Sequence, residues 1–72
     1  MPRGNSAMSN LDHYEKAIIH FLSHSGDSTI NEVSEGLKIS WATAKSRLFK
    51  LKNLGYVLEE KEGEVTYWKL NE

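Results

Sequence analysis

The stretch "SWATAKSRLFKLKNLGYV", residues 40–57, decides the fold of this sequence. It contains no acidic residue but four basic ones, which are Lys45, Arg47, Lys50 and Lys52. Widened to residues 36–58, the stretch gains Lys38 and still has no Asp or Glu. The chain as a whole is slightly acidic, with 10 acidic against 9 basic residues. The positive charge is therefore concentrated in one segment, and that segment is the first place to look for a function.

The apolar residues of this stretch recur at helical spacing. Ala44, Leu48 and Leu51 fall on one side when each residue advances about 100°, which predicts a helix from Trp41 to about Leu54. Ser40 is the expected N-cap, and Gly55 follows where a left-handed residue is favoured. Trp41, Arg47 and Leu54 lie at the edges of the buried side. The solvent side is expected to carry Ala42, Ser46, Phe49 and Asn53, flanked by Thr43, Lys45, Lys50 and Lys52.

Two helices are predicted upstream, each opened by a capping-box pattern. In "SNLD", Ser9 is the predicted N-cap and Asp12 its partner three residues later, and the helix is expected to end near His24. Its apolar stripe is predicted to consist of Leu11, Tyr14, Ile18, Phe21 and Leu22, with Ala17 beside them. "TINE" repeats the pattern with Thr29 and Glu32. The short helix that it opens has an apolar stripe of Ile30, Val33 and Leu37.

After Gly55 the hydrophobic pattern changes from helical to alternating. "YVLEEK" and "EVTYWKL" are two strand-like runs around Glu62–Gly63, which is a turn signal. Trp68 and Leu70 share the face that we expect to point toward the core. The order is helix, short helix, tight turn, helix and hairpin. This order predicts an α+β winged helix-turn-helix, with three helices followed by a two-stranded β-hairpin wing.

Length and composition narrow the class of protein. The 72 residues suit one domain, expected over residues 11–72, with residues 1–10 as a disordered arm or a cloning remnant. The chain has no Cys, which excludes a disulfide framework and a thiolate nucleophile. No catalytic motif is visible, so we expect no enzyme activity and no cofactor. No apolar run approaches the roughly 18 residues of a membrane span. A cytoplasmic protein is expected, associated with the nucleoid if the organism is prokaryotic.

Residues 29–57 and the later run "EGEVTYWKL" together resemble the winged helix-turn-helix superfamily, particularly the small regulators of bacteria and archaea. The resemblance spans about Leu11 to Leu70. The positions that match the common pattern are Ile39, Ser40, Thr43, Leu48, Leu51, Gly55, Val57, Trp68 and Leu70. The resemblance implies double-stranded DNA as the partner, the third helix in the major groove, and a role in transcription regulation.

Several residue types on the third helix suit contact with DNA. Lysines neutralise phosphates, short polar groups approach base edges, and a small residue permits close approach. The predicted DNA-binding residues are Ser40, Trp41, Ala42, Thr43, Lys45, Ser46, Phe49, Lys50 and Lys52. On the wing, Lys61, Thr66 and Tyr67 are the candidates. Two aromatic residues have an alternative role, since Trp41 can instead pack across the turn and Phe49 can pack against Trp68.

The wing is the part of the sequence that fits DNA least well. "LEEKEGE" carries Glu59, Glu60, Glu62 and Glu64 against Lys61. Carboxylates near phosphates are repelled, so the tip of the wing is expected to stay off the DNA or to touch it weakly. The alternative function is a winged-helix protein-interaction module of a larger nucleic-acid-processing assembly, with the acidic wing holding a basic partner. A homodimer on a palindromic site is a further expectation, with the Tyr14/Ile18 side of the first helix as its surface.

A weaker resemblance is to the Zα-type domains, small winged helices that bind left-handed nucleic acid. Phe49 and Trp68 resemble the aromatic pair of that family. The chain departs from the family pattern because Lys45 replaces a helix Asn, Phe49 replaces a Tyr, and "GEVTYW" lacks the wing prolines. His20 and His24 share a helix face, but no third ligand has suitable spacing, so no metal site is expected.

Overall fold

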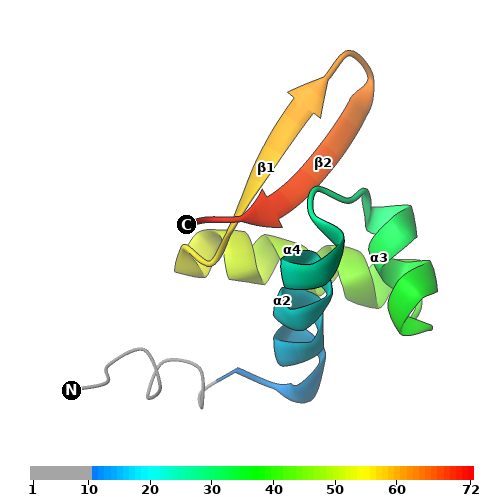
Figure 1. The fold of residues 1–72 in the computed structure, drawn as a ribbon. Coiled ribbons are helices and arrows are strands. Elements are labelled where there is room, and N and C mark those ends of the chain that lie inside the picture. The colour runs from blue at the N-terminus through cyan, green and yellow to red at the C-terminus, as the bar shows by residue number, and fades with distance from the viewer. Residues whose placement is uncertain (1–10) are drawn as a thin grey trace.

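The computed structural model describes residues 11–72 and has the predicted order of elements (Figure 1). The helices are α2 (His13–Ser25), α3 (Ile30–Leu37) and α4 (Trp41–Leu54), and the strands are β1 (Val57–Glu62) and β2 (Val65–Leu70). The two strands form an antiparallel hairpin that projects from the helical part (Figure 1). The predicted α+β fold, a winged helix-turn-helix, is confirmed. The arm predicted for residues 1–10 lies outside the described residues.

The first described helix begins later than the sequence suggested. Asp12, predicted as the third residue of a capping box, is itself the N-cap of α2, and Glu15 takes the third position. The Glu15 N–H donates to Asp12 Oδ1 at 2.8 Å, and the Asp12 N–H donates to Glu15 Oε1 at 2.7 Å. The cap predicted at Ser9 lies outside the described residues. In α3 the predicted capping box of Thr29 and Glu32 is confirmed.

A short connection of residues 38–40 joins α3 to α4. Lys38 adopts the left-handed conformation, with φ 58°, which turns the chain at once after α3. Ser40 is the N-cap of α4, as predicted, and its Oγ accepts from the Thr43 N–H at 3.0 Å. At the other end of α4, Gly55 ends the helix with φ 91°, also as predicted. These two ends fix the direction in which α4 leaves α3 and enters the hairpin.

The hairpin pairs Val57 with Leu70 at its base and Glu62 with Val65 at its tip. The turn lies at Gly63–Glu64, one residue later than the predicted Glu62–Gly63. A further bridge ties the base of the wing to the loop between α2 and α3. The Trp68 N–H donates to the Ser28 carbonyl at 2.7 Å, and the Ser28 N–H donates back at 3.0 Å. The position of the wing relative to the helices is therefore fixed by backbone bonds as well as by packing.

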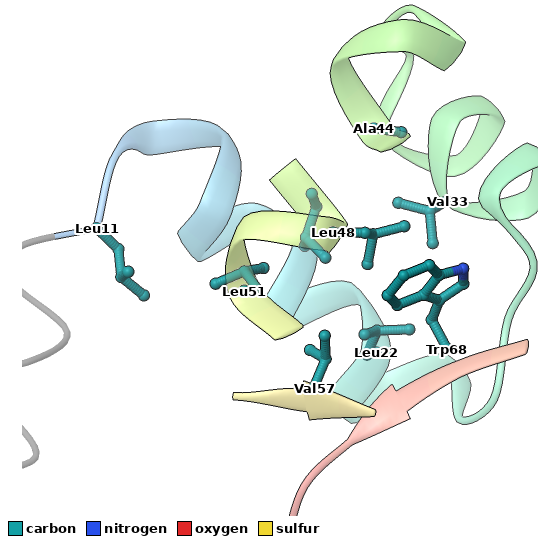
Figure 2. Packing of buried hydrophobic residues seen from close by; sticks show 9 residues of the cluster. Leu11, Leu22, Val33, Ala44, Leu48, Leu51, Val57 and Trp68 are labelled. Atoms are coloured by element: carbon teal, nitrogen blue, oxygen red, sulfur yellow. The ribbon is translucent and has the colours of Figure 1, made fainter. Parts of the chain in front are cut away.

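Trp68 lies at the centre of the core. Its side chain is fully buried and, as Figure 2 shows, rises from β2 into the group formed by Leu22, Leu48 and Val33. Such a ring removes about 150–250 Å² from water, more than any aliphatic residue of the cluster. Every element contributes to this core, which consists of Leu11, Ile18, Leu22, Val33, Ala44, Leu48, Leu51, Val57 and Trp68.

One prediction about the apolar stripe of α2 is wrong. Tyr14, expected inside, is 42% exposed, and Glu15 is fully buried instead. The buried line runs through Leu11, Glu15, Ile18 and Leu22, at steps of four, three and four residues, which is regular helical spacing. Because Ile18 is also fully buried, the surface proposed for dimerisation keeps Tyr14 but loses Ile18.

Gly36 has a packing role that the sequence did not indicate. A Cβ placed on Gly36 would lie 2.3 Å from Phe21 Cε1, far inside van der Waals contact. The absence of a side chain thus lets the ring of Phe21 lie directly against α3. A glycine within a helix destabilises it by about 0.5–1 kcal/mol relative to Ala. At Gly36 the close packing of α2 against α3 offsets this loss.

Candidate nucleic-acid interface

The exposed side of the first half of α4 is free of acidic residues. Ala44, Leu48 and Leu51 are fully buried, as predicted, and this orients the opposite side of the helix toward solvent. Four exposed residues follow one another along that side, and we call them the recognition strip: Trp41, Ala42, Lys45 and Ser46. All four were predicted to bind DNA.

Lys45 is the cation of the recognition strip. Its Nζ lies 5.2 Å from the centroid of the Trp41 ring, a cation–π geometry. Among residues 11–72, no acidic side chain forms an ion pair with Lys45. The same holds for Lys38 in the preceding turn. These two lysines are therefore the members of the basic cluster that can meet a phosphate without first leaving a carboxylate.

The start of α4 offers further groups for a negative ligand. The Thr43 N–H is taken by Ser40 Oγ and the Ala44 N–H by the Ser40 carbonyl, at 3.0 Å each. The amides of Trp41 and Ala42 belong to the first turn, where no intrahelical acceptor exists. The Ser40 hydroxyl donates to Thr43 Oγ1 at 2.9 Å. Because Thr43 accepts this bond, its own O–H remains available as a donor.

The other basic residues of α4 face acidic side chains of neighbouring elements. Lys50 Nζ lies 2.9 Å from Oε2 of Glu15, whose side chain is fully buried, while that of Lys50 is 54% exposed. The same carboxylate lies 3.9 Å from Arg47 Nε, which also donates to Asp12 Oδ2 at 2.8 Å. Arg47 and Lys50 thus connect α4 to the N-terminal end of α2. The contact joins a buried carboxylate, that of Glu15, to cationic side chains that are partly exposed to solvent.

Asp12 shows the effect of this contact on acidity. The Asp12 carboxylate accepts a hydrogen bond from the Glu15 backbone N–H and lies beside the Arg47 guanidinium. The hydrogen bond first, and then the positive charge, hold the pKa of Asp12 below its ordinary value of 3.8. Lys52, near the other end of α4, is paired with Glu59 of β1 at 2.7 Å. Three of the four cations in the opening stretch therefore have acidic partners, and within residues 11–72 Lys45 has none.

Phe49 takes the structural role that was one of its two predicted alternatives. Its ring meets Trp68 edge to face, with 5.1 Å between the centroids. It is partly buried against the core rather than fully projecting from the basic side. Lys52 Nζ lies over the Phe49 ring, 5.7 Å from its centroid. Phe49 thus joins α4 to the wing and leaves only part of its ring in contact with solvent.

The wing residues divide into a polar face and a charged tip. Lys61 and Thr66 pair across the hairpin, with Tyr67 beside them opposite Glu60. Lys61 is exposed, whereas Thr66 and Tyr67 are half-buried. Glu60 is engaged by Lys69 at 3.1 Å. Glu62 and Glu64 are exposed at the tip, and no ion pair within residues 11–72 involves them.

Other features of the described residues narrow the chemistry of the surface. The rings of His20 and His24 lie 4.4 Å apart on α2. Across residues 11–72, no three His, Asp or Glu side chains are placed to hold a metal ion together. None of the described helices is both long and apolar enough to cross a membrane.

The chain belongs to the winged helix-turn-helix DNA-binding family, whose sequence profile matches residues 11–57. The matched region contains the three helices of the described residues, α2, α3 and α4, and the whole recognition strip. No curated protein sequence gives a significant match. The family assignment therefore depends on the profile together with the fold.

Solved structures with the same fold include proteins of two kinds. The chain is similar to the apo-Zalpha domain of zebrafish PKZ, with 27% identity, a TM-score of 0.78, and coverage of 81% of this chain and 91% of that one. It is also similar to a Lactococcus lactis ZitR mutant in complex with DNA, with 28% identity, a TM-score of 0.79 and coverage of 86% of this chain. The match covers 44% of the ZitR chain, so this chain corresponds to less than half of that protein. Both resemblances stated from the sequence are thus reflected in the structure.

Proposed function

We propose that this protein reads double-stranded DNA in a sequence-dependent way, with α4 in the major groove, and that it regulates transcription. The observation that carries the proposal is the recognition strip, an acid-free exposed side of α4 that presents a cation, two apolar groups and a hydroxyl. A B-DNA major groove is wide enough to admit a helix. The DNA complex of the similar ZitR supports the same partner.

The proposed contacts fall into three groups according to how free each side chain is. Lys45, Ser46, Trp41 and Ala42 meet the groove directly, while Ser40, Thr43 and the first amides of α4 hold a phosphate. Lys50 and Lys52 can add phosphate contacts only by leaving Glu15 and Glu59, and Phe49 contributes the exposed part of its ring. Lys61, Thr66 and Tyr67 are the wing residues that approach the backbone.

Salt dependence separates these contributions. Each neutralised phosphate adds about −0.9 to the slope of log K against log salt concentration. If only Lys38 and Lys45 make phosphate contacts, the slope is about −1.8, and if Lys50 and Lys52 join them it is about −3.6. The test is a titration of labelled random-sequence duplex DNA at several salt concentrations, with Lys45→Glu as the variant. Binding with a slope in this range, lost in Lys45→Glu, supports the proposal. Absence of binding at low salt contradicts it.

A second candidate, left-handed DNA, is favoured by one observation. The edge-to-face pair of Phe49 and Trp68 matches the aromatic pair of the Zα resemblance, and a similar PKZ Zalpha domain has been solved in complex with ds(CG)6. Lys45 in place of the Asn and the absence of the wing prolines argue for right-handed DNA instead. Circular dichroism of a d(CG) repeat duplex during titration distinguishes the two, because conversion to the left-handed form inverts the spectrum.

The acidic tip of the wing supports the remaining alternative, a protein partner. Glu62 and Glu64 are exposed and lack cationic partners within residues 11–72. Two results together would establish a protein partner. The protein would fail to bind DNA, and it would bind a basic polypeptide through an interaction that the double substitution Glu62→Lys with Glu64→Lys abolishes. Sedimentation of the protein with and without DNA also tests the expected homodimer.

A further inference from the structure

The recognition strip is unusual in what it lacks. The side chains that read bases by paired hydrogen bonds are Arg, Lys, Asn and Gln. In the strip this type is represented by Lys45, whose Nζ lies over the Trp41 ring; α4 also contains Arg47 and Asn53. Arg47 is held by Asp12 on α2, and Asn53 lies in the last turn of α4, away from the strip. The strip itself offers the Trp41 ring, the Ala42 methyl group and the Ser46 hydroxyl. Most of its surface for base contact is therefore apolar.

The apolar surface continues from α4 onto the wing. Trp41 is 48% exposed and Val65 is 43% exposed. Both line one shallow depression, whose other lining residues are Thr29, Ile30, Asn31, Glu64 and Thr66. The Glu64 carboxylate disfavours a phosphate there, while the Trp41, Val65 and Ile30 side chains offer an apolar contact for a neutral group. The ligand that suits this place is small, apolar and uncharged, and it lies close to a phosphate that Lys45 can reach.

We propose that Trp41, flanked by Val65, binds the 5-methyl group of thymine in the major groove, and that the protein prefers thymine-containing sites for this reason. The inference rests on the proposed function and specifies its ligand. Thymine is the base that presents an apolar group in the major groove. Ala42, one residue further along the strip, is small enough to let the base edge approach. Lys45 neutralises the adjoining phosphate while its ammonium group stays over the Trp41 ring.

The test compares two duplexes that differ in the methyl group alone, poly(dA-dT) and poly(dA-dU). Burying one methyl group strengthens binding by about fourfold, so the wild-type protein is expected to bind the thymine duplex at least about fourfold more tightly. Trp41→Ala removes this preference, and Trp41→Phe retains most of it. The salt slope of Trp41→Ala stays at the wild-type value, because no phosphate contact is lost.

A control is Leu58→Ala, which removes an exposed apolar side chain from β1, outside the strip. It is expected to keep the thymine preference, so that loss of the preference in Trp41→Ala is not a general effect of removing an exposed apolar group; a preference caused by duplex stiffness would persist in both variants. Equal affinity of the wild-type protein for both duplexes overturns the inference and leaves the proposed function intact. A preference that persists in Trp41→Ala also overturns it. Failure to bind either duplex while random-sequence duplex is bound overturns this inference alone, and failure to bind random-sequence duplex as well overturns both proposals.

Discussion

Replacing the buried carboxylate of Glu15 is expected to change the stability of the protein and its affinity for DNA in opposite directions. Glu15→Gln keeps an oxygen that can accept the Asp12 N–H, but it removes the charge that faces Lys50. The Lys50 side chain is 54% exposed, so solvent screens the ion pair, and its contribution to stability is at most about 1 kcal/mol. The new amide also turns N–H groups toward two cations. We therefore expect the free energy of unfolding to fall by about 1–2 kcal/mol.

The same substitution releases Lys50 for DNA. One additional phosphate contact makes the salt slope steeper by about 0.9. Binding therefore strengthens at low salt although the protein is less stable. Stability is measured by urea denaturation with tryptophan fluorescence, and DNA binding by the duplex titration at several salt concentrations. The opposite signs of the two effects are the signature of a lysine shared between a buried carboxylate and a phosphate.

The matched control is Glu32→Gln in α3. Glu32 occupies the same capping-box position and changes the net charge by the same amount, but it is exposed and pairs with no cation within residues 11–72. It is expected to leave the salt slope unchanged. If Glu15→Gln and Glu32→Gln alter the slope equally, the effect is one of net charge. If Glu15→Gln leaves the slope at the wild-type value, Glu15 does not withhold Lys50 from DNA, and the reasoning fails.

Three further outcomes are expected. Gly36→Ala should destabilise the fold by about 1–3 kcal/mol, measured by urea denaturation, despite the better helix propensity of Ala. The double variant Gly36→Ala with Phe21→Leu should recover part of this loss. A single variant more stable than the wild type would contradict the close approach of Phe21 to Gly36. The folded-state pKa of Asp12 is depressed, so Asp12 stabilises the fold at pH values above about 3.8, the pKa expected in the unfolded chain, and this contribution is lost as pH falls through the folded-state pKa. Asp12→Asn should therefore make the free energy of unfolding depend less on pH in that acidic range. An unchanged pH dependence would contradict the assignment. Phe49→Leu should lose about 0.5–1.5 kcal/mol from the edge contact with Trp68 and keep the DNA salt slope, whereas a large loss of DNA affinity at unchanged stability would assign Phe49 to the nucleic acid.

The fold could be predicted from the sequence because its signals are local. Ser40 and Gly55 set the ends of α4, and the apolar spacing of Ala44, Leu48 and Leu51 sets its buried side, so no distant contact was needed to place the helix. The hairpin followed from alternation around a glycine, although the turn falls one residue later than expected. Winged-helix architecture then follows from the order of elements, because the tight turn at Lys38 leaves α4 little freedom of direction.

The errors came from residues whose environment is set by a distant partner. Glu15 occupies a position on the buried line of α2 at which an apolar residue is the ordinary choice, and the pattern alone favoured Tyr14. Its burial is understandable only with Arg47 and Lys50 of α4 beside it, more than thirty residues later in the chain. The spacing Leu11–Glu15–Ile18 contained a signal, since an acid on an apolar line needs a cation nearby. The sequence alone did not identify which cation supplies it.

The charge pairs of α4 reduce the number of its cations that are free to contact phosphates. A run of four cations suggests four phosphate contacts, yet Arg47, Lys50 and Lys52 lie against Asp12, Glu15 and Glu59. These pairs attach α4 to α2 on one side and to β1 on the other, and so orient it. What remains unpaired is a narrow strip around Lys45 at the start of the helix. Within residues 11–72 this strip has one cation without an ion pair, with Lys38 beside it in the preceding turn. Two such cations are expected to give weak nonspecific attraction, because nonspecific affinity grows with the number of phosphates neutralised. If the proposed function holds, discrimination between sites is expected to depend mainly on the neutral surface of Trp41 and Ala42, because few cations of α4 are left to attract DNA in general.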